Sequence, residues 1–105
     1  MVFSQEIVNI SSGDTITWIP TSKGHNVEII TSPNGTDFKS KTNREAKLTF
    51  TEPGIYYYLC TPHKSMGMIG LVIVDGDTSN IGEIAKSRAV GKSKKKLKAL
   101  LSELS

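Results

Sequence analysis

The first 74 positions contain short runs that are apolar or alternate between apolar and polar residues, separated by turn residues such as glycine, proline and asparagine. The segment Asp14–Pro20 shows alternation, because polar and apolar residues take turns along it; it is also rich in β-branched residues and follows the turn cluster Ser-Ser-Gly-Asp. Short runs at this spacing are typical of an all-β sandwich or Greek-key barrel. We predict strands over Gln5–Ile10, Asp14–Pro20, His25–Ile30, Ala46–Thr51, Ile55–Cys60 and Ile69–Val74, and a polar loop or short helix over residues 36–45.

The period of the pattern changes from Asp75 onward, where apolar residues recur at helical spacing. Val90 and Gly91 are expected to separate two helices, and Ser93 is expected to be the N-cap of the second. Three lysines then follow in its first turn, where the helix dipole disfavours cations, so burial of the apolar stripe must stabilise this helix. The stripes are Ile81, Ile84 and Ala85 in the first helix and Leu97, Leu100, Leu101 and Leu104 in the second.

The length of 105 residues favours a single domain over residues 1–105, with a β-sandwich over 1–74 and a helical extension over 75–105. Residues 1–74 carry six basic and six acidic residues, whereas residues 75–105 carry seven basic and four acidic ones. No apolar run approaches the roughly 20 residues of a membrane-spanning helix, so we expect no membrane insertion. The lysines of 92–98 have no aromatic residues between them, which favours a solvated helix face over nucleic-acid binding.

The only cysteine, Cys60, opens the run Cys-Thr-Pro-His-Lys-Ser-Met-Gly-Met, which also contains His63 and Met68, and the only other histidine is His25. One thiolate, two imidazoles and one thioether are the ligand set of a blue-copper electron-transfer site. Because the run lies between two predicted strands, one loop can present three ligands, and a neighbouring strand must supply the fourth. We therefore predict one type 1 Cu(I)/Cu(II) ion held by His25, Cys60, His63 and Met68, with no open position for a substrate.

Each of these residues alone more often has a structural role, and only their combination predicts a copper electron carrier. Two other functions remain open. A copper-binding or storage module would use the same ligands without a redox partner. An enzyme would use Cys60 as nucleophile and His63 as base, but no third residue evidently orients the base, and Met68 would have no role. A structural zinc site is disfavoured because zinc sites seldom use methionine.

Residues beside the ligands are expected to hold them in place. Asn26 can donate its backbone N–H to the thiolate and join the two ligand-bearing segments through its side chain, with Thr61 next to the cysteine. Pro62 lacks an N–H and stiffens the loop. Gly67 and Gly70 are expected to permit tight backbone geometry around the axial methionine, although ordinary turn glycines fit the pattern nearly as well.

Seven short motifs, spread over nearly the whole chain, are shared with one known family: Gly13-Asp14-Thr15, Lys23-Gly24-His25-Asn26-Val27-Glu28, Phe38-Lys39-Ser40-Lys41, Thr49-Phe50-Thr51, Pro53-Gly54, Cys60-Thr61-Pro62-His63 and Met66-Gly67-Met68. By these motifs the chain resembles the cupredoxin family, and within it the pseudoazurins. The resemblance implies a β-sandwich with two C-terminal helices, a single copper with the four ligands named above, and a periplasmic electron shuttle. It also implies a copper or haem nitrite reductase as a redox partner, and so a role in denitrification.

Two features depart from the family pattern. Pseudoazurins normally have an N-terminal strand before a Met-Val-Phe segment, and this sequence begins at that methionine. We therefore expect a truncated start, with the first strand and a signal peptide upstream; the alternative is a shortened protein with an exposed sheet edge. The family often has a lysine just before the ligand cysteine, where this chain has Leu59, and Lys64 restores a positive charge nearby.

By resemblance, the outer edge of the His63 ring is expected at the surface, in a small apolar patch with a charged rim. Such a patch suits a weak, short-lived encounter between a monomeric carrier and a redox protein. The lysines would otherwise be ordinary solvated residues. The expected patch contains Gly24, Pro62 and Met66, joined by Met1 if the start is truncated, and its rim contains Lys23, Lys39, Lys41 and Lys64.

Overall fold

A computed structural model of the chain describes residues 6–19, 24–35, 38–61, 68–87, 89 and 91–104. Within these ranges the chain is mainly β, and two helices follow the last strand. The elements are β1 (Ile7–Ile10), β2 (Thr15–Trp18), β3 (Glu28–Thr31), β4 (Ala46–Thr49), β5 (Gly54–Leu59), β6 (Ile69–Val74), α1 (Ile81–Ala85) and α2 (Lys92–Ser102).

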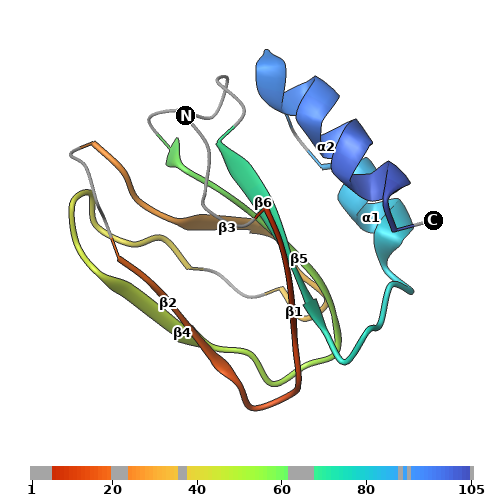
Figure 1. Cartoon of the computed structure of the whole chain (residues 1–105), viewed down its shortest axis with the longest axis horizontal. Helices are drawn as coiled ribbons and strands as arrows, with labels where there is room; N and C mark the ends of the chain where they lie inside the picture. The colour runs from red at the N-terminus through yellow and green to blue at the C-terminus, as the bar shows by residue number, and fades with distance from the viewer. Residues whose placement is uncertain are drawn as a thin grey trace.

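The strands form two sheets, and the two helices pack on the outer face of the larger sheet (Figure 1). The larger sheet has the order β1-β6-β5-β3, in which β5 is antiparallel to both of its neighbours and β1 is parallel to β6. The smaller sheet pairs β2 with β4 in antiparallel register. The predicted β-sandwich with two C-terminal helices is therefore confirmed.

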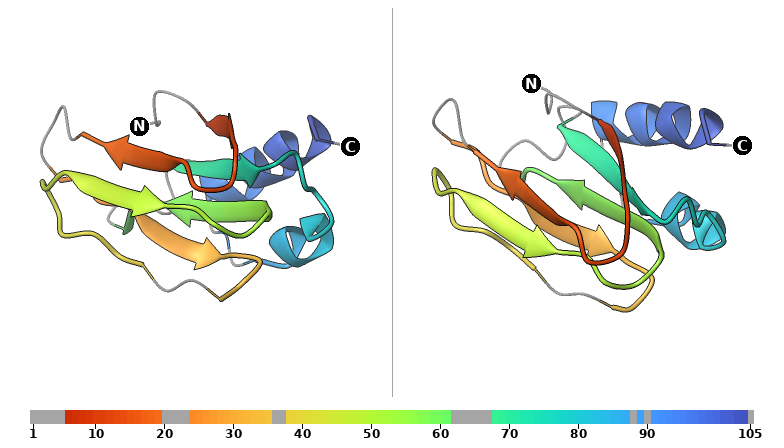
Figure 2. Two further views of the ribbon diagram at one scale, coloured as in Figure 1. Left: turned by 90° about the horizontal axis from the view of Figure 1, so that it is seen from below. Right: turned by 60° about the horizontal axis from the view of Figure 1, so that its bottom comes forward.

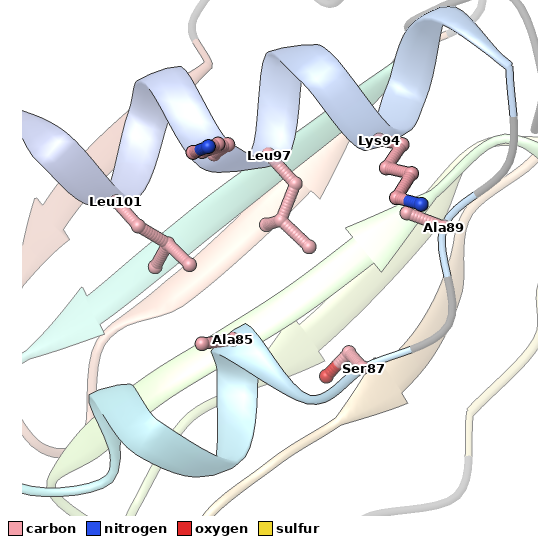
Figure 3. Close-up of a pocket in the computed structure, with 7 residues that line it drawn as sticks. Ala85, Ser87, Ala89, Lys94, Leu97 and Leu101 are labelled. Atoms are coloured by element: carbon pink, nitrogen blue, oxygen red, sulfur yellow. The ribbon is translucent and has the colours of Figure 1, made fainter.

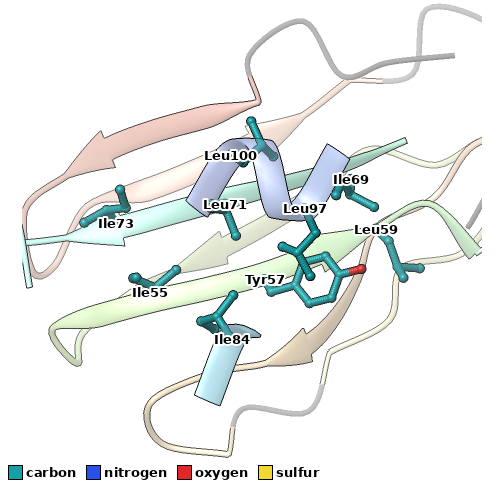
Figure 4. Packing of buried hydrophobic residues seen from close by; sticks show 9 residues of the cluster. All are labelled: Ile55, Tyr57, Leu59, Ile69, Leu71, Ile73, Ile84, Leu97 and Leu100. Carbon is teal, nitrogen blue, oxygen red and sulfur yellow. The ribbon is translucent and has the colours of Figure 1, made fainter. Parts of the chain in front are cut away.

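The strands β5 and β6 are buried on both faces, because the helices cover one face of their sheet and the smaller sheet covers the other. Successive side chains of a strand point to opposite faces, so Tyr57 packs on the helix side and Tyr58 packs between the sheets. Figure 4 shows the helix-side cluster of Ile55, Tyr57, Leu59, Ile69, Leu71, Ile73, Ile84, Leu97 and Leu100.

The space between the sheets is filled by a second apolar cluster, in which aromatic rings meet edge to face. The ring centroids of Phe50 and Tyr56 are 4.8 Å apart, and those of Trp18 and Tyr58 are 5.4 Å apart. Edge-to-face pairs of this kind contribute beyond the area that they bury. The buried members of this cluster are Val27, Ile29, Ala46, Phe50, Tyr56, Tyr58, Val72 and Val74.

The strand β3 begins at Glu28, whereas the sequence predicted it from His25. The side chain of Ser40 explains the later start, because its Oγ accepts a hydrogen bond from the Val27 N–H at 2.7 Å. A side chain there replaces the carbonyl that a continuing strand ladder would need. Residues 38–45 form a loop, the first of the two predicted alternatives, with a turn closed by the Arg44 N–H and the Lys41 carbonyl at 3.3 Å.

Most residues of the two predicted apolar stripes pack on the larger sheet: Ile84, Leu97 and Leu100 are buried there, and Ile81, Leu101 and Leu104 are partly buried. Ala85, which was predicted to belong to the first stripe, is exposed. The prediction that Ser93 caps α2 is wrong: the helix begins at Lys92, Gly91 precedes it with φ 57°, and the Ser93 side chain is buried. The hydroxyl therefore lies against the protein, one position inside the helix, where it cannot serve as the N-cap. Lys96 of α2 forms an ion pair with Glu6, which links the helix to the segment before β1.

A groove of about 350 Å³ runs between α1 and α2 (Figure 3). It is lined by Ala85, Ser87, Ala89, Lys94, Leu97, Lys98 and Leu101.

Neither helix, nor any other helix within the described residues, is both long and apolar enough to cross a lipid bilayer.

Candidate metal centre

Two of the predicted ligands lie at the junction between β5 and β6. Cys60 directly follows β5, Met68 directly precedes β6, and the Cys60 N–H donates a hydrogen bond to the Met68 carbonyl at 3.0 Å. Figure 2 shows the end of β5 beside the start of β6 at this edge of the sheet. This backbone hydrogen bond continues the ladder one step past the strands, so it holds Cys60 and Met68 side by side where β5 ends and β6 begins.

A third predicted ligand, His25, approaches the cysteine from the segment before β3. Its ring nitrogen Nδ1 lies 3.7 Å from Cys60 Sγ, and the Gly24 carbonyl oxygen lies 4.0 Å from the same sulfur. Cys60 is fully buried and Met68 is 7% exposed, so water has little access to these donors. Residues 35 positions apart in the chain thus present a thiol and an imidazole to one point.

The fourth predicted ligand, His63, lies outside the described residues. The same is true of Pro62, Lys64, Met66 and Gly67, and of Lys23 upstream. Within the described residues, no three histidine, cysteine, aspartate or glutamate side chains gather as a metal-binding group. This agrees with the predicted ligand set. Of its described members, only His25 and Cys60 are of these residue types, and the third is the methionine Met68.

Asn26 joins the segment that carries His25 to the segment that carries Cys60. Its Oδ1 accepts a hydrogen bond from the Thr61 N–H at 2.7 Å, and its Nδ2 donates to Thr61 Oγ1 at 3.0 Å. The same Nδ2 lies 3.3 Å from the Ser40 carbonyl, to which it also donates. The side-chain link expected from the sequence is present, and the 5% exposure of Asn26 makes its loss costly, because the partner groups would stay buried and unpaired.

Glu28 extends this network and was not identified from the sequence. The Thr61 hydroxyl donates to Glu28 Oε1 at 2.8 Å, so Thr61 receives a hydrogen bond from Asn26 and passes one on to a carboxylate. Asn26 and Glu28 are two positions apart in an extended segment, which puts their side chains on one face. That spacing was the available signal, but the partner Thr61 lies far away in the chain.

Asn43 is a second residue that the sequence analysis missed. Its Oδ1 accepts a hydrogen bond from the Gly24 N–H at 2.5 Å, and its own N–H donates to the His25 carbonyl at 2.9 Å. The local signal was an asparagine in a polar turn, which tolerates a positive φ. Nothing local indicated that this turn would contact the backbone around His25.

The structure corrects the expectation for Gly70 and shows where Leu59 lies. Gly70 lies opposite Tyr58 in the sheet, and an added Cβ would overlap the tyrosine ring, so this glycine makes room for Tyr58. It is therefore a packing glycine within β6, and the expected effect on the geometry around Met68 is not what requires it. Leu59, at the position where the family often has lysine, is buried in the helix-side cluster.

The donors that the described residues bring together suit a copper ion. Metal–sulfur and metal–nitrogen bonds of about 2.3 Å and about 2.0 Å, as zinc makes, together exceed the 3.7 Å between Cys60 Sγ and His25 Nδ1, so one ion can contact both atoms. Thiolate and thioether are soft ligands that select Cu(I), and imidazole suits copper in either oxidation state. A buried set of this kind favours copper over magnesium or calcium, which prefer oxygen ligands.

Comparison with known proteins agrees with this chemistry. Residues 1–75 match the model of the copper binding proteins of the plastocyanin/azurin family. The chain is 41% identical to the pseudoazurin of Paracoccus pantotrophus over 107 aligned positions, which cover 99% of this chain and 74% of the relative.

Solved structures show the same likeness over the whole fold. A pseudoazurin from Sinorhizobium superposes with a TM-score of 0.92 at 34% identity, covering 99% of this chain and 84% of that one. The pseudoazurin of Methylobacterium extorquens AM1 superposes with a TM-score of 0.91 at 31% identity, covering 100% of this chain and 88% of that one. The chain therefore belongs to the plastocyanin/azurin family of copper proteins, as a blue copper electron carrier of the pseudoazurin type with a single type 1 copper.

Proposed function

We propose that the protein moves single electrons between redox proteins through one copper ion held by His25, Cys60, His63 and Met68. The observation that carries the proposal is the distance of 3.7 Å between His25 Nδ1 and Cys60 Sγ. Met68 lies at the same place, because its carbonyl accepts a hydrogen bond from the Cys60 N–H. When bound, copper would supply the one-electron Cu(I)/Cu(II) couple, and Met68 would contribute a weakly binding thioether.

The protein's part is to keep the ligands in one arrangement for both oxidation states. The hydrogen bonds between Asn26 and Thr61 fasten the cysteine segment to the histidine segment, and the backbone hydrogen bond between Cys60 and Met68 holds the end of β5 beside the start of β6. Burial of Cys60 excludes water and competing ligands from the sulfur. With the ligands held in this way, little movement accompanies electron gain or loss, which favours fast transfer.

The first experiment is a Cu(II) titration of the full chain, followed by visible absorption. We expect an intense thiolate-to-copper charge-transfer band that ascorbate bleaches and ferricyanide restores, with copper retained through the cycle. Cys60→Ser removes the thiolate and should abolish the band. Ser87→Ala should leave the band unchanged, because Ser87 contacts Thr31 at the end of β3 that lies away from the site.

The outcomes separate the competing functions. A storage module would bind copper but lose it, or fail to recover its colour, on repeated reduction and oxidation. Colour that survives in Cys60→Ser would show that the thiolate is not a ligand. Absence of the band in the unmodified chain would contradict the copper assignment itself.

We further propose a copper or haem nitrite reductase as a physiological partner, periplasmic location and a role in denitrification. Support comes from the pseudoazurin relatives and from Lys39 and Lys41, which are exposed on the loop that leads to the Asn43 contact with His25. Exposed cations near the copper ligands suit a brief encounter of a monomeric carrier with an acidic surface.

The docking proposal is tested by charge reversal. Lys39→Glu should slow electron transfer to nitrite reductase at low salt, and the difference should shrink at high salt. Lys86→Glu is the control, because Lys86 follows α1 and lies away from the copper ligands. The N-cap of α1, Asn80, contacts Ile55 at the start of β5, whereas Cys60 follows the end of that strand. Equal rates for Lys39→Glu and the unmodified protein would contradict the docking role while leaving the copper assignment untouched.

We also propose that residues 1–105 form one domain. The helix-side cluster supports this, because it combines residues of β5 and β6 with Ile84 of α1 and Leu97 and Leu100 of α2. The helices thereby complete the core of the sheet, and a single cooperative unfolding transition is expected by calorimetry. Two separate transitions would contradict the proposal.

A further inference from the structure

The backbone on both sides of His25 is held by a single residue from another loop. Asn43 accepts the Gly24 N–H on its Oδ1 and donates its own N–H to the His25 carbonyl, at 2.5 Å and 2.9 Å. The two bonds fasten the peptide group before Gly24 and the peptide group after His25. The α-carbon of the histidine therefore lies between two fixed points.

The conformation of Asn43 makes this double contact possible. Asn43 has φ 66° and is the third residue of the turn that the Arg44 N–H and the Lys41 carbonyl close. A positive φ at this position is the requirement of a type II turn, which glycine and asparagine meet most readily. Glycine would satisfy the turn but would lack the side-chain acceptor, so the acceptor is a separate property of asparagine.

The loop that carries Asn43 is anchored independently of His25. Its Ser40 exchanges two hydrogen bonds with Val27, through the Ser40 N–H at 2.8 Å and through Ser40 Oγ at 2.7 Å. Asn26 Nδ2 also donates to the Ser40 carbonyl, at 3.3 Å. The contacts of Asn43 can therefore hold the histidine segment against a loop that Val27 and Asn26 already fix.

We propose that Asn43 is a positioning residue for the copper centre, which sets where the His25 imidazole lies relative to Cys60 Sγ. This inference rests on the proposed function, since it concerns a ligand of that site. Asn43 is not a proposed ligand of the metal; it acts through the main chain of His25. Partners of metal ligands commonly change metal affinity by about 10-fold to 100-fold when they are removed.

The test compares three variants of the full chain loaded with Cu(II). Asn43→Gly keeps the positive φ and removes the acceptor, so it should alter the relative intensities of the charge-transfer bands, shift the reduction potential and lower copper affinity about 10-fold or more. Asn43→Asp keeps an oxygen acceptor and should retain the band pattern and the copper affinity; its added charge makes it unsuitable for comparing potentials.

The matched control is Asp75→Gly. Asp75 also has a positive φ, 58°, accepts the Ser12 N–H on its Oδ1 at 2.9 Å, and donates its own N–H to the Ile10 carbonyl at 2.8 Å. It makes the same kind of double contact after β6, at the strand end opposite to Met68. Asp75→Gly should lower the melting temperature of the copper-free protein and leave the spectrum and potential unchanged.

Each outcome decides the inference. Altered bands in Asn43→Gly, with normal bands in Asn43→Asp and Asp75→Gly, support it. Identical spectra, potential and affinity in Asn43→Gly and the unmodified protein overturn it, and so does failure of Asn43→Gly to fold, since Asn43 would then support the whole domain. Absence of the band in the unmodified protein would instead overturn the proposed function.

Discussion

Gly70 shows how the absence of one side chain shapes the core. It pairs with Tyr58 across β5 and β6, and the ring of Tyr58 occupies the space that a Cβ at position 70 would need. The ring in turn packs edge to face on Trp18 of the smaller sheet. A glycine inside a strand usually weakens it, and here it permits the close approach of an aromatic residue.

Gly70→Ala should therefore destabilise the protein by about 1–3 kcal/mol, the usual range for overpacking a core. Gly82→Ala is the matched control, because no atom lies within 4 Å of a Cβ there and alanine favours the helix α1. That control should be neutral or up to about 1 kcal/mol stabilising. Urea unfolding of the two copper-free variants measures both effects, and an equally stable Gly70→Ala would contradict the packing role.

At the scale of elements, α2 is stabilised by packing against an unfavourable charge arrangement. Its first turn contains Lys92 and Lys94 and no acidic residue, although the positive end of the helix dipole lies there. Its N-cap, Gly91, makes no side-chain hydrogen bond to the helix. Leu97 and Leu100, buried on the larger sheet, are therefore the main source of its stability.

Lys94→Glu should stabilise the protein by about 0.3–1 kcal/mol, because it places a negative charge in the first turn of α2. That substitution also places an acidic residue at position 94 four residues before Lys98. Lys98→Glu pairs the same two positions with the charges exchanged, but its negative charge lies in the middle of the helix. It should stabilise less. Thermal unfolding at low salt measures the difference, which should decrease as salt is added; equal effects from the two substitutions would show that the dipole plays no part.

At the scale of the whole molecule, adjacent tyrosines of β5 connect the two layers of the core. Tyr57 packs under the helices and Tyr58 packs between the sheets, and both side chains are fully buried. Burial raises the pKa of Tyr57 to about 12. Burial also raises the pKa of Tyr58 to about 12, although a hydrogen bond with Trp18 opposes the rise.

These shifts predict that the protein loses stability in alkali. The stabilisation is complete below about pH 10, the usual pKa of tyrosine in an unfolded chain, and is lost as the pH rises toward 12. In that window the unfolded state binds fewer protons, so the free energy of unfolding falls by up to about 1.4 kcal/mol per pH unit for each tyrosine. Urea unfolding between pH 9 and pH 11.5 measures the slope.

Tyr57→Phe provides the internal comparison for the alkaline effect. Phenylalanine keeps most of the apolar packing and cannot ionise, so the variant should show a smaller loss of stability over the same pH range. An identical slope in the two proteins would show that ionisation of Tyr57 does not contribute.

The sequence by itself predicted the strands and helices, apart from their exact ends, and all four proposed ligands. Strand alternation and the leucine stripe are local periodicities, so they identify which faces are buried without knowledge of the partner. The spacing from Cys60 to Met68 is likewise local, because a single loop between two strands carries it.

The tertiary structure alone decided which distant residues meet. Tertiary structure decided the parallel pairing of β1 with β6, the fit of Gly70 to Tyr58 and the burial of Ser93. It also decided the contacts of Glu28 with Thr61 and of Asn43 with His25. Local sequence is compatible with many partners at each of these positions. Hydrogen bonds and side-chain shape select among those partners only after the sheets have brought the chain segments together.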